Sequence, residues 1–132
     1  MKTIIVHSLV HARAALEAAR DCGQPVRLLT PPNGARYAGP LFYWEVVKLA
    51  ERESGHSAAA TMIDCGPDAG VALSALRCGW RTIAFTGARD ARAKLASIAE
   101  QSGGVVVARV PAALDLLDEP KPDAACRGHL RP

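Results

Sequence analysis

Four short apolar runs in this chain each stop at a polar residue, and a helical pattern begins soon after. The runs cover residues 4–6, 26–29, 62–63 and 83–85, and they stop at His7, Thr30, Asp64 and Thr86. Buried strands that alternate with helices are typical of a parallel α/β sheet, because parallel strands need crossover connections. The four polar residues therefore mark the carboxyl ends of strands, where ligands of open α/β sheets bind.

Apolar residues at helical spacing separate most of these runs. Residues 9–19 carry them at intervals of three and four, and Gly23 predicts the end of that helix. Two more helices are expected, from Pro67 to Gly79 and from Ala91 to Gly103. Five strands are predicted in all, at residues 3–6, 26–29, 59–63, 82–85 and 105–107.

The length of 132 residues favours one domain. We expect a single α/β domain over residues 1–118. Residues 119–132 are rich in proline, charge and small side chains and have no periodic apolar face. That composition predicts a loosely held C-terminal tail.

The connection over residues 31–57 is longer than every other crossover. In the flavodoxin-like order 2-1-3-4-5, the connection from strand 2 to strand 3 alone has to pass over another strand. The lengths therefore predict a three-layer α-β-α sandwich with five parallel strands in that order. Another Rossmann-like order is the alternative, and it would need a sixth strand from the C-terminal part of the chain.

The 2-1-3-4-5 order places a topological switch point between strands 1 and 3. It would bring His7 and Ser8 beside Asp64, Cys65 and Gly66. The open crevice expected at such a point favours non-catalytic binding of a small anionic ligand.

A second helix start could contribute to the same binding site. Thr86 and Gly87 follow the fourth strand, and Arg89 comes two residues later. Free backbone N–H groups at a helix start, with an arginine nearby, can hold a phosphate or a carboxylate.

A small enzyme is the first alternative function. If a helix begins at Pro67, its N-terminus lowers the pKa of Cys65, which could act as a nucleophile with His7 as base and Asp64 nearby. The phosphatase loop of a cysteine, five residues and an arginine is not present, because Val71 stands at the arginine position. A structural thiol at a strand end is the simpler interpretation.

Metal and cofactor sites have weak support. His7 and His11, with Asp64 or Cys65, could supply three ligands, but their spacing across a turn does not align both rings on one helix face, so no metal is predicted. The sequence has no P-loop, no GxGxxG after the first strand and no GxSxG, so no cofactor is indicated.

Four of the six aromatic residues fall within eight positions, at Tyr37, Phe42, Tyr43 and Trp44. The last three begin a helical pattern over residues 40–53 whose apolar arc is wider than one sheet contact needs. These rings could cover the sheet, or they could form a partner surface, which is the second alternative function. We predict a homo-oligomer, a homodimer above all, in which Trp44 contributes to the interface.

Charge and cysteine content limit the remaining classes. Sixteen basic and thirteen acidic residues are interspersed, which leaves no basic stripe for nucleic acid. No segment resembles a membrane span or a signal peptide. The four cysteines have no CxxC spacing and fit free thiols, so a cytoplasmic location is expected.

Overall fold

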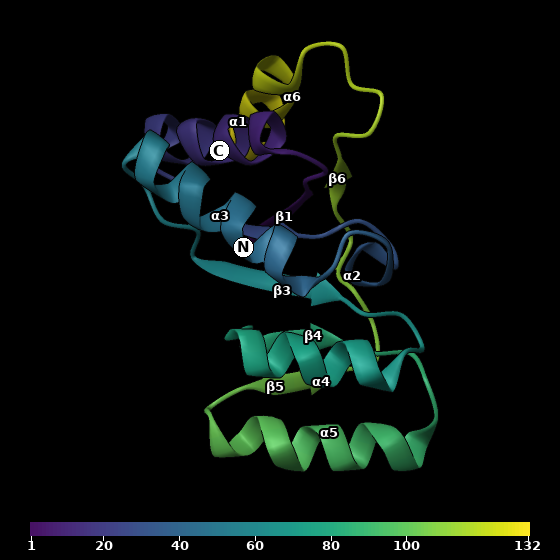
Figure 1. Cartoon of the computed structure of the whole chain (residues 1–132). Helices are drawn as coiled ribbons and strands as arrows, with labels where there is room; N and C mark the ends of the chain where they lie inside the picture. The colour runs from purple at the N-terminus through teal and green to yellow at the C-terminus, as the bar shows by residue number, and fades with distance from the viewer. The chain divides into compact units, whose positions relative to one another are not determined.

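The computed structural model describes all 132 residues and confirms a parallel α/β architecture (Figure 1). Its elements are β1 (Lys2–Ile5), α1 (Leu9–Cys22), β2 (Val26–Leu29), α2 (Gly34–Tyr37), α3 (Pro40–Ser54), β3 (Ala60–Asp64), α4 (Ala69–Cys78), β4 (Thr82–Ala84), α5 (Arg89–Gln101), β5 (Val105–Val107), β6 (Leu114–Asp115) and α6 (Pro122–Leu130). The five predicted strands are present within one residue at either end.

Six parallel strands follow the order β5-β4-β3-β2-β1-β6, and helices flank them. The predicted order 2-1-3-4-5 is wrong, because β1 pairs with β2 on one side and with β6 on the other. The order also differs from the Rossmann order 3-2-1-4-5-6. The connection over residues 31–57 is long because it contains two helices, α2 and α3, and its length was therefore no sign of a strand crossing.

The chain forms two compact units, which are described separately. The first consists of Met1–Leu29, Glu45–Ala60 and Pro111–Pro132. The second consists of Thr30–Trp44 and Thr61–Val110. The prediction of one domain over residues 1–118 stays a prediction.

The first unit is built on the strands β2, β1 and β6. Ile4 of β1 lies opposite Leu28 of β2, and both side chains are buried. Helix α1 buries a face made almost entirely of alanine, together with Leu16, which is fully buried. Gly23 ends this helix in the left-handed conformation with φ 65°, as its sequence position predicts.

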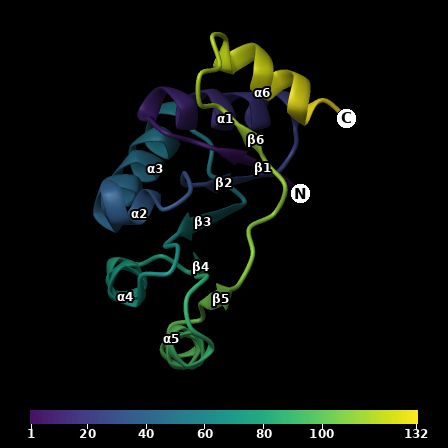
Figure 2. The ribbon, with the colours of Figure 1, turned by 90° about the vertical axis from the view of Figure 1, so that its right-hand side faces the viewer.

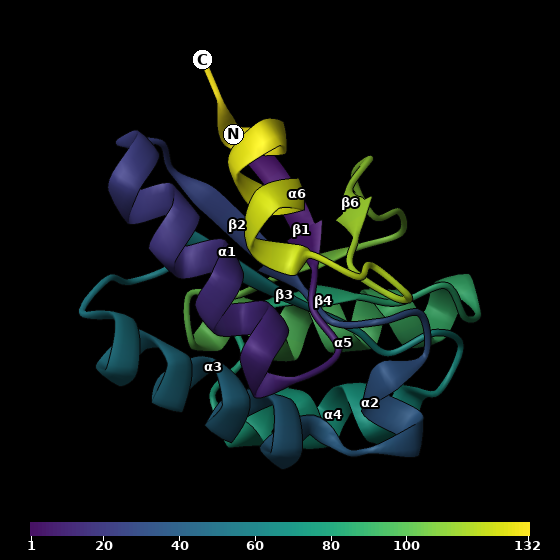
Figure 3. The same cartoon turned by 90° about the horizontal axis from the view of Figure 1, so that it is seen from above.

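Helix α6 packs along α1 in the first unit (Figure 3). Cys126 and Leu130, one helical turn apart, are 0% and 2% exposed. The segment that composition predicts to be a loose tail is therefore largely a docked helix. Two buried side chains in a nine-residue helix leave no visible apolar periodicity, so composition did not indicate this helix.

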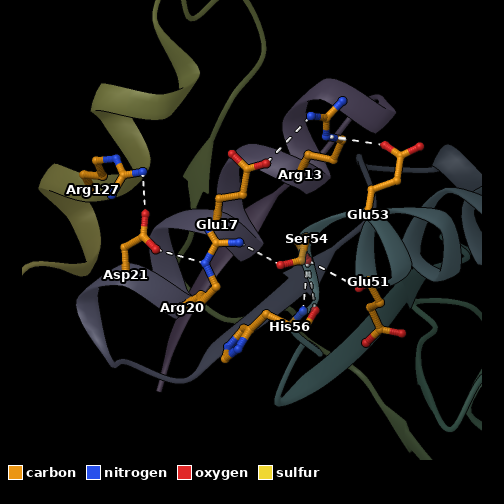
Figure 4. Close-up of polar contacts among 9 residues, drawn as sticks. All are labelled: Arg13, Glu17, Arg20, Asp21, Glu51, Glu53, Ser54, His56 and Arg127. Atoms are coloured by element: carbon orange, nitrogen blue, oxygen red, sulfur yellow. Dashed lines mark hydrogen bonds and ion pairs between the residues drawn. The ribbon is translucent and has the colours of Figure 1, made fainter.

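Charged side chains connect the helices of this unit (Figure 4). Asp21 near the end of α1 accepts hydrogen bonds from Arg20 and from Arg127 of α6, both at 2.9 Å. Arg20 also donates to the carbonyl of Ser54 at 2.7 Å. Exposed pairs of this kind contribute little each, so the buried side chains of α6 account for most of its attachment.

The second unit contains β4 between β3 and β5, with Ile83 and Phe85 in its core. Helices α4 and α5 pack against each other (Figure 2). Consecutive right-handed crossovers that step in one direction place their helices on the same face of a sheet. Within this unit, α4 and α5 therefore share one face, as they also do in the predicted order, where strands 3, 4 and 5 are likewise consecutive neighbours.

Aromatic rings fill the second unit where α3 begins. The rings of Trp44 and Trp80 lie 5.5 Å apart in an edge-to-face arrangement, and the Trp80 indole donates to the carbonyl of Pro40 at 3.1 Å. Tyr43 is buried as well. Tyr43 and Trp44 thus pack in this unit as the simpler prediction expects, whereas Tyr37 and Phe42 are exposed. A contribution of Trp44 to a homodimer interface stays a prediction.

Candidate functional site

The turn from β1 into α1 places the first two predicted site residues. The backbone N–H of Val6 still bonds to Leu29 as a strand residue would, at 2.9 Å, and His7 and Ser8 follow directly. Ser8 is the N-cap of α1, and its hydroxyl accepts from the N–H of His11 at 3.3 Å. Both residues therefore lie at the carboxyl end of β1, as predicted.

The strand beside β1 at this end is β6, and it supplies a carboxylate. Ile5 lies opposite Asp115, and Nε2 of His7 lies 2.7 Å from Oδ1 of Asp115. The N–H of Leu117 donates to the same carboxylate at 2.9 Å. Burial raises the pKa of Asp115, but these two hydrogen bonds and the nearby imidazoles outweigh it and lower the pKa overall.

His11 completes the cluster from the first turn of α1. Its Nδ1 accepts the backbone N–H of His7 at 3.1 Å, and the two rings meet edge to face with centroids 5.6 Å apart. A nitrogen that accepts a hydrogen bond carries no proton, so this contact favours the neutral form of His11 with its proton on Nε2. The pKa of His11 is lowered by burial and by His7, against the opposing charge of Asp115.

Two ring nitrogens of the cluster remain available. Neither Nδ1 of His7 nor Nε2 of His11 takes part in a hydrogen bond or is buried. The His7 side chain is 20% exposed and that of Asp115 is 43% exposed, so the cluster is open to solvent. The arrangement presents one imidazole oriented by a carboxylate and one oriented by the backbone.

The second unit brings together most of the other predicted residues. The N–H of Thr86 bonds to the carbonyl of Gly66 at 2.8 Å, and the N–H of Gly66 bonds to Oδ1 of Asp64 at 2.9 Å. Gly87 follows Thr86, and Arg89 begins α5 and is exposed. The loop after β3 thus satisfies its own donors, which leaves fewer of them for a ligand.

Cys65 is buried in this loop and has no exposed surface. Burial, followed by the charges of Asp64 and Asp68, raises the pKa of its thiol to about 12. Helix α4 begins at Ala69, not at Pro67, and the carboxylate of Asp68 caps it by accepting from Val71 at 3.0 Å. The structural thiol is therefore the better interpretation, and Cys65 lacks the properties of a nucleophile at neutral pH.

The predicted pocket depended on strands 1 and 3 being neighbours. Because β1 has β2 and β6 as its neighbours, the reason for grouping His7 and Ser8 with Asp64, Cys65 and Gly66 does not hold. A common pocket of these residues stays a prediction.

Asp115 is the residue that the sequence analysis missed. It lies in a strand of two residues, which is too short for any period to be recognised. The available signal was a carboxylate among the apolar residues 114–117.

The structure contains no group of three or more histidine, cysteine, aspartate or glutamate side chains that could hold a metal ion. None of its helices combines the length and the apolar character that crossing a bilayer requires. No protein-family model matches the chain, and no curated protein has significant sequence similarity to it.

Proposed function

We propose that the protein binds a small anionic molecule at the β1–α1 turn, through His7, Ser8 and His11. The observation that carries the proposal is the pair of free imidazole nitrogens at the start of a long helix. Backbone N–H groups in the first turn of a helix favour negative charge, and the free Nε2–H of His11 can donate to the same oxygen atoms.

The charges at the starts of α4 and α5 favour α1 over these two helices as the anion site. Helix α1 has a neutral cap, Ser8, and no acidic residue in its first turn. Helix α4 is capped by Asp68, and α5 carries Asp90 in its first turn. A carboxylate at a helix start already interacts with the positive end of the helix dipole, and it repels a second anion.

Asp115 restricts what this site can bind. Its carboxylate, 2.7 Å from Nε2 of His7, repels an anion. We therefore expect the ligand to contact the imidazoles and the helix start rather than Asp115.

Titration with inorganic phosphate, followed by NMR of the histidine rings and backbone amides, tests this proposal. We expect the largest shifts at His7, Ser8 and His11, and weakened binding in His7→Gln and Ser8→Ala. His56→Gln is the matched control, because that loop lies near the amino end of β2. Shifts confined to other residues, or binding that survives both variants unchanged, would contradict the proposal.

Two further proposals concern the setting of the protein. The proposed location is the cytoplasm, which the four free cysteines support. The proposed assembly is a homodimer, supported by the exposed side chains of Tyr37, Leu41 and Phe42.

A further inference from the structure

We infer that His7 and His11 catalyse proton transfer at a carbon next to the carbonyl group of a small anionic substrate. The inference rests on the proposed function, because the same site would hold the phosphate or carboxylate of that substrate. It also replaces the predicted combination of Cys65, Asp64 and His7 with one that the geometry of the first unit supports.

His7 has the arrangement of a general base. A proton on Nε2 is directed at the carboxylate of Asp115, 2.7 Å away, which leaves a lone pair on Nδ1. No hydrogen bond occupies Nδ1, and it is not buried. A carboxylate in this position fixes the tautomer and stabilises the imidazolium that forms when the base takes up a proton.

His11 has the arrangement of a neutral hydrogen-bond donor. The backbone N–H of His7 occupies its Nδ1, so its proton lies on Nε2, which is free. The lowered pKa of His11 agrees with this neutral form. A neutral imidazole can polarise a carbonyl group during enolisation without becoming charged itself.

The separation of the two rings suits one small substrate. Their centroids are 5.6 Å apart. For this step, a carbon and the oxygen of its adjoining carbonyl must each lie within about 3 Å of one of the two free nitrogens. The base and the donor would then act on neighbouring groups of one molecule.

The step needs no other reactant. The lone pair on Nδ1 of His7 forms an N–H bond as the C–H bond of the substrate breaks. The C–H electron pair becomes the C=C bond of an enolate, and the carbonyl π pair moves to the oxygen, which accepts from Nε2 of His11. The imidazolium exchanges its proton with solvent and returns a deuteron to the same carbon in D2O, the enolate oxygen re-forms the carbonyl group, and the net result is exchange of the carbon-bound hydrogen.

Enolisation fits the cluster better than hydrolysis does. Hydrolysis through a covalent intermediate would require a nucleophile beside the base, since one imidazole can act first as base and then as acid. The cluster offers two free nitrogens, and the hydroxyl of Ser8 already caps α1.

Exchange of carbon-bound hydrogen in D2O, followed by proton NMR, tests the inference. The probes are dihydroxyacetone phosphate, glyceraldehyde 3-phosphate and hydroxypyruvate, with uncharged dihydroxyacetone for comparison. We expect the wild-type protein to exchange at least one anionic probe on the order of 100-fold faster than His7→Gln does, the lower range for general base catalysis. His56→Gln should equal the wild type.

The variant Asp115→Asn separates orientation of the His7 ring from binding of the anion. Because Asp115 is a positioning residue, this variant should exchange the probe more slowly while it still binds inorganic phosphate. Asp115→Glu should restore part of the exchange rate. Phosphate binding without exchange of any probe, in a folded protein, overturns this inference and leaves the proposed function intact. Absence of phosphate binding overturns both, and equal rates in wild type and His7→Gln overturn the inference alone.

Discussion

The contact between His7 and Asp115 joins residues 108 positions apart in the chain. In the sequence alone, His7 is explained as a turn residue and Asp115 as an isolated acid. The contact between them gives them a possible chemical role, because a histidine that faces a carboxylate has a defined tautomer and one free nitrogen. The site is thus defined at the scale of single residues.

Acid should destabilise the first unit through His11 and Asp115. Both groups have lowered pKa values in the folded protein, so the unfolded chain binds more protons as the pH falls. The contribution of His11 to stability is fully present above about pH 6.5, the pKa of histidine in the unfolded chain, and declines at lower pH. The contribution of Asp115 declines below about pH 4. Denaturant unfolding at a series of pH values measures this, and Asp115→Asn should remove the decline below pH 4. If Asp115→Asn loses stability below pH 4 as the wild type does, other carboxylates cause that loss.

Cys65 should be the slower thiol in a comparison with Cys22 and Cys78. It is fully buried and its pKa is raised to about 12, whereas the other two are partly exposed. Alkylation of the native protein at neutral pH, followed by mass spectrometry, should modify Cys22 and Cys78 first. The three rates should become similar in denaturant. Rapid labelling of native Cys65 would restore the nucleophile hypothesis.

Gly79→Ala should destabilise the protein by about 1–3 kcal/mol, the usual range for backbone strain. Gly79 has φ 121°, and an added Cβ would lie 3.0 Å from the Trp44 ring. Gly103→Ala is the matched control, because it has φ 76° and open space around the added atom. Chemical denaturation should find a larger loss for Gly79→Ala. Equal losses would mean that the contact with Trp44 adds nothing to the strain.

At the scale of elements, α6 shows how a short helix can be held by very few side chains. Its contacts are with α1 and β1, and both of its fully enclosed side chains lie on one face. Its position also connects it to the candidate site, because the same segment of chain carries β6 and Asp115 into the first unit. Loosening of α6 should therefore affect the site as well.

Leu130→Ala should destabilise the first unit by about 2–4 kcal/mol, as expected when a large buried side chain is removed. Arg131→Ala, at the exposed neighbouring position, should have an effect within about 0.5 kcal/mol. Hydrogen exchange should report faster exchange in α6 and in the Leu117 amide. If Leu130→Ala and Arg131→Ala are equally stable, the prediction of a loose tail would be restored.

At the scale of the whole molecule, the open question with the clearest experiment is self-association. Tyr37 is 82% exposed, Leu41 62% and Phe42 47%. If these side chains form a dimer interface, light scattering should give twice the monomer mass, and Tyr37→Glu or Phe42→Glu should reduce it to the monomer. The interface should bury on the order of 1,000 Å² or more in total. A monomer at high concentration would contradict the proposed homodimer.

The local elements follow from the amino-acid sequence alone. Short apolar runs located five strands, and Gly23 and Gly79 ended the helices that they were predicted to end. These features depend on neighbours along the chain, such as the left-handed conformation that glycine permits. The same local reasoning placed His7 and Ser8 at the end of a strand.

Which strands are neighbours, and which residues form the candidate site, depends on tertiary contacts. The position of β6 beside β1 depends on pairing between distant segments, and a strand of two residues has no pattern of its own. The burial of Cys65 likewise depends on what packs around it, so a pKa inferred from a helix start had the wrong sign. Non-local pairing and burial are properties of the folded chain, which is why Asp115 could not be assigned to His7 beforehand.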